Sequence, residues 1–460
     1  MITAMDSRVM DANAEALGVP VATLMDNAGK AVADLLEEQF PDKHILFVCG
    51  PGNNGGDGFA AALRMNPKRV EVALLKKPSS IHTDVARERY SLLECPIREY
   101  SSDILREFDV IVDCALGTGI SGEVRDPYLT FINDANASGK TIVSVDVPSG
   151  IGTDTCIHPS CTVTFHDVKA GMDNDTCGNI LVADIGIPED AYRLVGPGDM
   201  QRFPKPRSDS HKGDNGRLMI IAGGPYYGAP AMASMAALRT GTDIVRLFTP
   251  SSVSKIVASY CPVLMITELP GNILDSEDVE DLLRASVDYD AVLIGPGLGT
   301  APETILAVKE FVRKCRTPVI IDADALTAIK GMRLSASAVL TPHKGEFARL
   351  GGSGDDVESL AREVNAVVIR KGSEDIISDG MNKRVNKYGS AGMTGAGTGD
   401  VLAGIIGALL SKGMSAFDSA CLGAYISGRA GEIAFDDLSY GMIATDIINR
   451  IPLVLKEGLR

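Results

Sequence analysis

The 460-residue sequence contains no tryptophan, and aromatic residues make up only 5% of it. Its cores must therefore be built from aliphatic and small side chains. No uncharged apolar run reaches the roughly 18 residues that a membrane-spanning helix needs, and the longest, residues 401–410, is interrupted by Gly404 and Gly407. The first residues carry acids and lack the basic-then-apolar pattern of a secretory signal, so we expect a cytoplasmic protein.

Basic residues are also in deficit, because 44 Lys and Arg stand against 60 Asp and Glu, which gives a formal net charge of −16. Nucleic acid or an anionic membrane surface would be repelled, so neither is expected as a partner. A phosphate-bearing ligand must then be held by local backbone N–H groups rather than by the overall field. The 45% of hydrophobic residues and the length indicate a soluble chain of two or three domains.

The nine cysteines are an odd number and are scattered along the chain. Cys49 and Cys114 end apolar runs, which is typical of reduced thiols in a core. Another group of Cys and His residues lies close together in sequence, but its spacings match no common zinc pattern. We therefore interpret as structural the residues Cys156, His158, Cys161, His166 and Cys177.

Both halves of the chain alternate short apolar runs with helical patterns, which predicts parallel sheets with helices on both faces. In the first half we expect strands at 44–49, 69–75, 109–114 and 141–146, and helices at 58–65, 83–93 and 128–137. In the second half we expect strands at 217–222, 243–248, 291–294, 318–322, 338–340 and 366–370, and helices at 231–239, 303–314 and 399–410. A segment rich in Pro, Ser and charge, residues 204–210, predicts a linker between two doubly wound α/β domains, 1–205 and 206–460.

Three loops of the first half follow predicted strands and carry polar residues. The first, CGPGNNGGDG at 49–58, is rich in glycine and precedes a helix, so its backbone can approach an anionic ligand closely. The second follows Asp113 and the third follows Asp146. Because ligands lie beyond the carboxyl ends of parallel strands, these loops predict one site. Asn54, Asp113 and Ser149 offer hard oxygen ligands for an alkali or alkaline-earth cation, and Asp146 is a candidate general acid or base.

At these motifs, residues 1–205 resemble the NAD(P)HX epimerases, which interconvert the two C6 epimers of hydrated NADH or NADPH and bind K⁺. The resemblance implies a Rossmann-like domain with K⁺ on Asn54, Asp113 and Ser149. That Asp146 moves the proton is our hypothesis. The implied hydrate-binding positions are Asn53, Asn54, Gly55, Gly56, Asp57, Gly117, Thr118, Gly119, Ile120, Ser121, Gly122, Glu123 and Asp146.

The clearest motif of the second half is GAGTGDVLAGIIGALL at 395–410. A Gly-Thr-Gly sequence that opens a helix can cradle a phosphoryl group, and Asp400 beside it suits a base that deprotonates an attacking hydroxyl. A helix cap would explain Asp400 but not the residues before it. Gly-rich loops also follow the strands that begin at 217 and 291, and Lys371 after the strand at 366–370 supplies a cation.

Residues 207–460 resemble the ribokinase-like, ADP-dependent NAD(P)H-hydrate dehydratases. The resemblance implies that ADP, with Mg²⁺, phosphorylates the C6 hydroxyl of the S epimer, and that loss of phosphate then restores NAD(P)H and leaves AMP. The family usually reads ATGGTGD where this chain has TGAGTGD, so Ala396 fills a usual glycine position. The implied hydrate contacts are Ala229, Gly297, His343 and Asp400, and the implied nucleotide contacts are Lys371, Gly372, Ser373, Glu374, Asp375 and Gly399.

The sequence thus favours a bifunctional metabolite-repair enzyme that binds NAD(P)H hydrates and ADP and forms a homo-oligomer. A vitamin or sugar kinase would share the Gly-Thr-Gly-Asp motif but would leave the first site unexplained. A nucleotide-sensing module without turnover would be expected to lose its acidic groups, whereas Asp113, Asp146 and Asp400 are all present.

Overall fold

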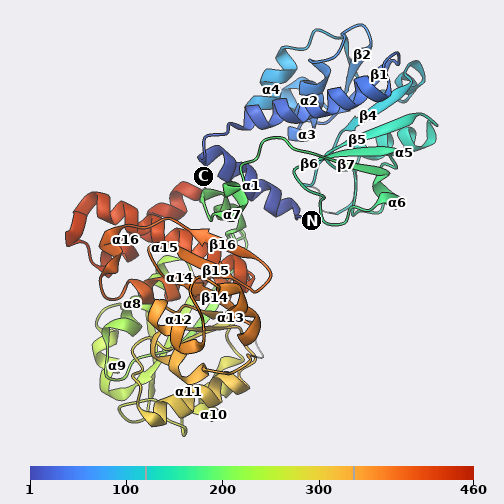
Figure 1. Cartoon of the computed structure of the whole chain (residues 1–460). Helices are drawn as coiled ribbons and strands as arrows, with labels where there is room; N and C mark the ends of the chain where they lie inside the picture. The colour runs from blue at the N-terminus through green and yellow to red at the C-terminus, as the bar shows by residue number, and fades with distance from the viewer. Residues whose placement is uncertain (120–121, 335–336, 460) are drawn as a thin grey trace. The chain divides into compact units, whose positions relative to one another are not determined.

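The computed structural model describes residues 1–119, 122–334 and 337–459, and the chain divides into two compact units, Met1–Glu189 and Asp190–Arg460 (Figure 1). Each unit is a parallel sheet covered by helices, which confirms the predicted fold class. The division lies before the predicted linker because the preceding segment packs on the second unit. The buried Asp199 forms an ion pair with Arg384, and the Val195 amide donates to the Val385 carbonyl at 3.0 Å. The functional boundary at 205/206 stays a prediction.

The sheet of the first unit has seven strands among the described residues, all of them parallel. The strand order reverses its direction between β1 and β4, and at such a switch point two loops diverge and leave a crevice for a ligand. The four predicted strands correspond to β1, β2, β4 and β5. In spatial order the strands are β3 (Ile97–Glu99), β2 (Val70–Leu74), β1 (Ile45–Cys49), β4 (Val110–Cys114), β5 (Thr141–Val145), β6 (Cys161–Phe165) and β7 (Asn179–Ala183).

Glycines bring the third helix of this unit against the sheet. The helix begins at Asn53, so the polar Gly-rich motif forms its first turn instead of preceding it. A Cβ on Gly55 would lie 2.0 Å from the Gly50 carbonyl oxygen, and one on Gly58 would lie 2.6 Å from the Cys114 sulfur. The helices of the unit are α1 (Ala4–Ala16), α2 (Val21–Gln39), α3 (Asn53–Ala62), α4 (Asp84–Ser91), α5 (Tyr128–Ala137) and α6 (Asn174–Cys177), with the 3₁₀ turns η1 (Pro78–Ser80) and η2 (Ser102–Glu107).

The second sheet has nine strands in the described part of the chain. Its last two strand pairings in spatial order are antiparallel. All six predicted strands are present, as β8, β9, β11, β12, β13 and β14. In spatial order the strands are β10 (Met265–Leu269), β9 (Ile244–Pro250), β8 (Arg217–Ile221), β11 (Ala291–Ile294), β12 (Val319–Ile321), β13 (Ala338–Leu340), β14 (Val367–Arg370), β15 (Asp375–Ser378) and β16 (Lys383–Asn386).

Two helical layers cover this sheet. Leu218 and Ile220 of β8 pack into a core with helices α8, α14, α15 and α16, whereas Met219 and Ile221 face α10, α11, α12 and α13, as the alternation of side chains along a strand requires. The helices are α7 (Asp190–Arg193), α8 (Gly228–Arg239), α9 (Ser251–Ala258), α10 (Val279–Ser286), α11 (Pro302–Lys314), α12 (Lys344–Leu350), α13 (Val357–Val364), α14 (Thr398–Ser411), α15 (Ala416–Leu438) and α16 (Ala444–Gly458), with the 3₁₀ turns η3 (Pro197–Arg202), η4 (Ala323–Ile329), η5 (Ala391–Thr394) and η6 (Ser439–Gly441).

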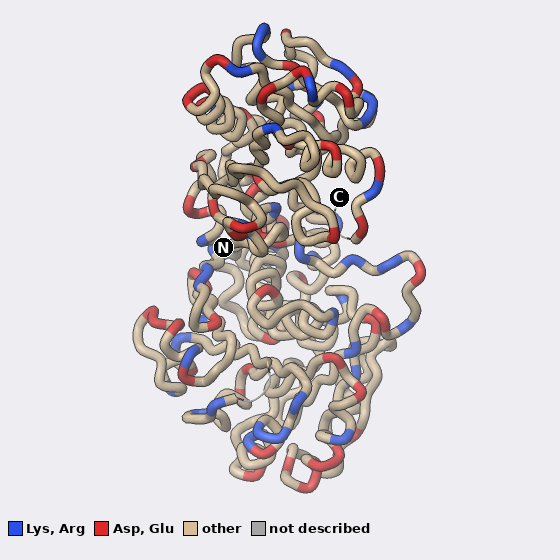
Figure 2. Tube along the Cα trace, turned by 90° about the vertical axis from the view of Figure 1, so that its right-hand side faces the viewer, with Lys and Arg blue, Asp and Glu red and all other residues tan. Residues whose placement is uncertain are grey.

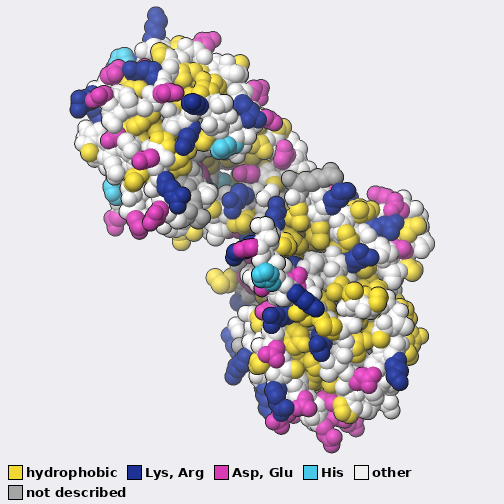
Figure 3. Space-filling model, turned by 180° about the vertical axis from the view of Figure 1, so that it is seen from behind, with side chains coloured by type: hydrophobic (Ala, Val, Ile, Leu, Met, Phe, Trp, Pro, Cys, Tyr) yellow, Lys and Arg dark blue, Asp and Glu magenta, His cyan; other side chains and the backbone are white. Residues whose placement is uncertain are grey.

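Charged residues of both signs are scattered over the trace of each unit (Figure 2), and hydrophobic and charged side chains are mixed on the face shown in Figure 3. Within the described ranges, no helix combines the length and the apolar character that crossing a bilayer requires. The nine cysteines are free thiols. Burial raises the pKa of Cys156, Cys161 and Cys177, and no three His, Cys, Asp or Glu residues of the described chain gather as metal ligands.

Candidate active sites

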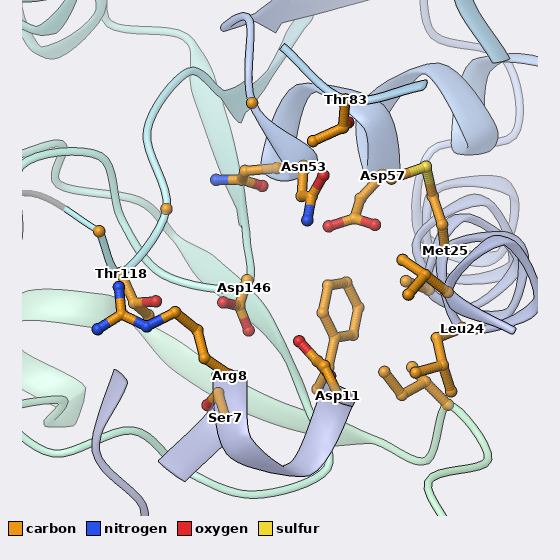
Figure 4. A pocket seen from close by; sticks show the side chains of 18 of the residues that line it. Ser7, Arg8, Asp11, Leu24, Met25, Asn53, Asp57, Thr83, Thr118 and Asp146 are labelled. Carbon is orange, nitrogen blue, oxygen red and sulfur yellow. The ribbon is translucent and has the colours of Figure 1, made fainter. Parts of the chain in front are cut away.

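The first unit contains a pocket of about 540 Å³ beyond the carboxyl ends of β1, β4, β5 and β6 (Figure 4). It lies at the switch point between β1 and β4, as expected for an open parallel sheet. Its walls carry Asn53 and Asp57 from α3, Thr118 after β4, and Asp146 after β5. Helix α1, which the sequence patterns did not predict, covers one side with Arg8 and Asp11.

Asp146 is held by a buried cation. Its carboxylate forms an ion pair with the ammonium of Lys169, which also donates to the Thr164 hydroxyl at 3.0 Å and to the Phe165 carbonyl at 2.7 Å. Lys169 is only 4% exposed, so these three acceptors fix its position. Asp146 has a φ of 64°, a rare value for a residue other than glycine. Such backbone strain is often found where a side chain must point into a functional site.

Two more carboxyl groups line the same pocket. Figure 4 shows Asp11, Asp57 and Asp146 directed toward one space from three elements. Burial, with a smaller contribution from the charge of Asp146, raises the pKa of Asp11 to about 6. Burial and the charges of Asp146 and Asp11 raise the pKa of Asp57 well above its ordinary value. The pocket can therefore hold both a protonated and an ionised carboxyl group near neutral pH.

A cluster of buried oxygen atoms lies beside this pocket. Asp113 is fully buried and accepts hydrogen bonds from the Ser144 hydroxyl at 2.9 Å and from the Ser149 amide and hydroxyl at 2.8 and 2.5 Å. The pKa of Asp113 is nevertheless raised, because the cost of burial is the largest effect. Asn54 donates to the Leu116 carbonyl at 3.0 Å, while its own Oδ1 is buried and has no hydrogen-bond partner among the described residues.

In the second unit, Asp400 lies in the first turn of α14, beyond the carboxyl ends of the central strands. Burial and the neighbouring charges of Asp322 and Asp324 raise the pKa of Asp400 to about 7. The charge of Lys371 acts in the opposite direction and offsets only part of this rise. The Lys371 ammonium forms an ion pair with Asp322 at 3.1 Å. Burial alone would lower the pKa of Lys371, but its acidic neighbours together outweigh burial and raise it. A Cβ on Gly399 would lie 3.1 Å from the Lys371 ammonium, so this cation reaches the amino end of α14.

Two further pairs of predicted residues in the second half lie close together. His343 caps α12 by accepting hydrogen bonds from the Gly345 amide at 3.0 Å and the Glu346 amide at 3.4 Å, and it pairs with Lys371 through the backbone. A Cβ on Gly297, which has a φ of 69°, would lie 3.3 Å from that of Ala229. The structure thus brings Ala229 against Gly297, His343 beside Lys371, and Lys371 to the end of α14 that carries Asp400.

The loop that precedes α14 accepts Ala396 without strain. The N-cap residue Gly397 has a φ of 92°, and a Cβ there would lie 2.3 Å from the Met232 sulfur. Five described residues other than glycine have a positive φ, and Ala396 is not one of them. The glycine that this turn requires is therefore Gly397.

Some predicted positions have other roles or lie elsewhere. Gly55 and Gly56 pack against Gly50 and Met25 and do not line the pocket. Gly122 and Glu123 are also absent from its lining, whereas Gly117, Thr118 and Gly119 belong to it. Ile120 and Ser121 lie outside the described residues. In the second unit, Ser373 and Glu374 are exposed, whereas Asp375 accepts a hydrogen bond from the Gly372 amide at 3.1 Å.

Sequence reasoning missed several residues of these sites. Asp11 and Arg8 belong to α1, and Lys169 follows β6, neither of which was predicted. A capping box between Thr3 and Asp6 is the local signal that could have revealed α1. Lys169 carries no local signal, because only the tertiary fold brings it to Asp146. Asp322 and Asp324 lie at the end of the strand predicted at 318–322, but only the tertiary fold makes them neighbours of Asp400.

Comparisons with known proteins match both units. A family described as NAD(P)H-hydrate dehydratase matches residues 218–453, and one described as YjeF-related protein N-terminus matches residues 21–171. A bifunctional NAD(P)H-hydrate repair enzyme of Archaeoglobus fulgidus is 38% identical, with 98% of this chain and 97% of that protein covered. One of Methanocaldococcus jannaschii is also 38% identical and covers 99% of this chain and 94% of its own length.

Two solved structures resemble the second unit. A ribokinase-like superfamily protein of Enterococcus faecalis has a TM-score of 0.52 at 24% identity, over 58% of this chain and 96% of its own. An ADP/ATP-dependent NAD(P)H-hydrate dehydratase of Bacillus subtilis, crystallised with ATP and Mg²⁺, has a TM-score of 0.51 at 24% identity, over 58% of this chain and 99% of its own. The likeness shows the ribokinase-like fold that the sequence predicted.

Proposed function

Because the chain belongs to the family of bifunctional NAD(P)H-hydrate repair enzymes, we propose that its two units perform the two steps of that repair. The first unit interconverts the R and S forms of hydrated NADH and NADPH. The second dehydrates the S form to NAD(P)H with ADP and releases AMP and phosphate. One observation carries this assignment: the relatives match both units from end to end, and each unit has a carboxylate with restricted exposure, Asp146 in the pocket of the first unit and Asp400 in the first turn of α14 in the second.

Asp400 is the base of the dehydratase. Its carboxylate removes the proton of the C6 hydroxyl as the hydroxyl oxygen attacks the terminal phosphorus of ADP, and AMP leaves. Phosphate then leaves C6 with its electron pair as a proton is lost from C5, which restores the C5–C6 double bond. The two-step route is chemically sound because phosphate is a far better leaving group than hydroxide. A pKa of about 7 suits a base that must be ionised near neutral pH.

The amino end of α14 and Lys371 bind the transferring phosphoryl group. The helix has no side-chain cap, so no N-cap side chain competes with a phosphoryl group for its first N–H groups. Lys371 adds a fixed positive charge at the same place. Mg²⁺ would enter bound to the phosphates of ADP, where it would neutralise their charge, because no three acidic, His or Cys side chains of the described residues gather to hold it alone. Residues Lys371 to Asp375, with Gly399, form the nucleotide side of the site.

The oxygen cluster of the first unit fits K⁺. Its atoms are hard donors, and the unpartnered Asn54 Oδ1 is an acceptor that a cation would satisfy. We assign Asn54, Asp113 and Ser149 as the residues that hold K⁺, which would supply a positive charge beside the buried carboxylate of Asp113. Asp146 is the acid–base residue at the C6 centre of the hydrate. The homo-oligomer and the cytoplasmic location stay predictions.

The test uses the whole chain and separated hydrate epimers. With ADP and Mg²⁺, the S epimer should regain the absorbance of the reduced nicotinamide and release one AMP and one phosphate for each coenzyme restored. The R epimer should be restored at the same yield after a delay set by epimerisation. Without ADP neither epimer should regain the absorbance, although the two should still interconvert. A stable phosphorylated product, or restoration without AMP, would contradict the proposal.

A further inference from the structure

The pocket of the first unit holds more carboxyl groups than the proposed epimerase mechanism uses. Asp146 comes from the loop after β5, Asp57 from α3, and Asp11 from α1, and Figure 4 shows the three directed toward a common space. Asn54, whose buried Oδ1 has no partner among the described residues, lines the same pocket. The family match over residues 21–171 does not include α1, and the proposed mechanism gives Asp11 no role.

Epimerisation makes a demand that one carboxylate cannot meet. The two hydrates differ only in the face of the ring from which the C6 hydroxyl projects. When the ring is bound in one orientation, the oxygen that leaves and the oxygen that arrives lie on opposite faces. A proton must be given on one face and taken on the other, so two acid–base groups must approach the ring from different directions.

We propose that Asp11 is the second acid–base residue of this pocket and serves the ring face opposite to Asp146, an inference that rests on the proposed epimerase function. Protonated Asp11 gives its proton to the C6 hydroxyl, which leaves as water while the N1 lone pair forms a C6–N1 double bond. The Asp146 carboxylate then removes a proton from a water molecule that adds to the other face of C6, and the electron pair returns to N1. Exchange with solvent resets both carboxyl groups, and the reverse reaction uses them in the opposite order.

The charges around Asp11 suit this role. Asp57 faces it from α3, Asp146 from the β5 loop and Lys169 from the β6 loop, while Arg8 and His166 also line the pocket. Figure 4 shows Arg8 reaching toward Thr118 rather than toward Asp11. The intermediate carries a positive charge on the ring, and a pocket with three carboxyl groups favours it. Burial and Asp146 raise the pKa of Asp11 to about 6, so both of its forms are populated near neutral pH.

The decisive experiment compares the full-length Asp11→Asn variant with wild type and with Glu15→Gln. The control removes one negative charge from the exposed face of the same helix. We expect Asp11→Asn to lower the epimerisation kcat by about 100-fold or more, which is the usual value of a general acid or base, with little change in KM. The control should match wild type. Dehydration of the S epimer by the same preparation should be unchanged, which shows that the variant chain is intact.

The pH profile separates a chemical role from a structural one. Epimerisation requires that one of the two carboxyl groups, Asp11 or Asp146, carries a proton. The wild-type kcat/KM should therefore fall as the pH rises above about 6, the pKa of Asp11. The Asp11→Asn variant should lose this fall, and Asp11→Glu should restore it with part of the rate. An Asp11→Asn variant that epimerises at the wild-type rate overturns the inference alone. A wild-type chain without epimerase activity overturns the proposed function as well.

Discussion

At the scale of residues, the two assigned acid–base groups differ in their counter-charges. Asp146 has a buried ammonium in direct contact, whereas Asp400 has Asp322 and Asp324 nearby and shares Lys371 with Asp322. A carboxylate that must accept a proton benefits from a raised pKa, because its conjugate acid is then more stable. The cost is that the ionised form of Asp400 destabilises the folded chain.

This cost gives a prediction for Asp400→Asn. An unfolded Asp ionises near pH 3.8 and the folded Asp400 near 7, so the folded state keeps its proton between these values and the free energy of unfolding falls as pH rises through that window. We expect the variant to be more stable than wild type at pH 8, by up to about 4 kcal/mol, and equally stable near pH 4. Denaturant unfolding followed by circular dichroism measures this, because the chain has no tryptophan for fluorescence.

The exposed Asp436 is the control, since Asp436→Asn should leave the free energy of unfolding unchanged at both pH values. A stabilisation of Asp400→Asn that persists at pH 4 would mean that burial and repulsion do not govern the pKa of this carboxyl group.

Whether these residues could be predicted from the sequence depends on where their neighbours lie along the chain. Asp146 and Asp400 stand in local motifs, whereas Asp11, Lys169 and Asp322 gain their roles only from neighbours distant in sequence.

At the scale of elements, α14 positions the dehydratase chemistry because it packs closely on α8. A Cβ on Gly404 would lie 2.2 Å from the Ala233 carbonyl oxygen, so glycine lets the two helix backbones approach each other. This contact holds α14 against α8, whose first turn contains Ala229. Parallel strands and α14 were predictable because their apolar runs are continuous. Helix α15 was not, because it is buried on most sides and has no polar stripe to give a period.

We therefore expect Gly404→Ala to separate α8 from α14. Overpacking against backbone costs about 1–3 kcal/mol, of which alanine's better helix propensity returns up to about 1 kcal/mol. The unfolding temperature of the second unit and the dehydration rate should both fall. Gly407→Ala is the matched control, because the nearest atoms to its Cβ would be side-chain methyls and not backbone, those of Leu218 at 3.1 and 3.2 Å and that of Ile320 at 3.8 Å. Equal effects of the two substitutions would show that helix packing at Gly404 is not what positions α14.

At the scale of the whole molecule, the ligands proposed for the chain carry a charge of the same sign as the chain. The net charge of −16 opposes the approach of ADP and of hydrated coenzyme, so the helix ends and buried lysines must supply the attraction locally. The two units have separate sheets and separate cores. Each site is built from residues of one unit only, so neither site needs the other for its chemistry.

The separation of the sites predicts complementation between two damaged chains. On a mixture of both hydrate epimers with ADP, full-length Asp146→Asn should quickly restore only the S fraction, and Asp400→Asn should restore nothing. A mixture of the two variants should restore all of the coenzyme, because the epimer made by one chain can diffuse to the other. Absorbance of the reduced nicotinamide gives the restored fraction, and Asp400→Asn mixed with the double variant is the control that should stay inactive. Restoration that stops at the S fraction in the mixture would mean that the hydrate passes only between sites of the same chain.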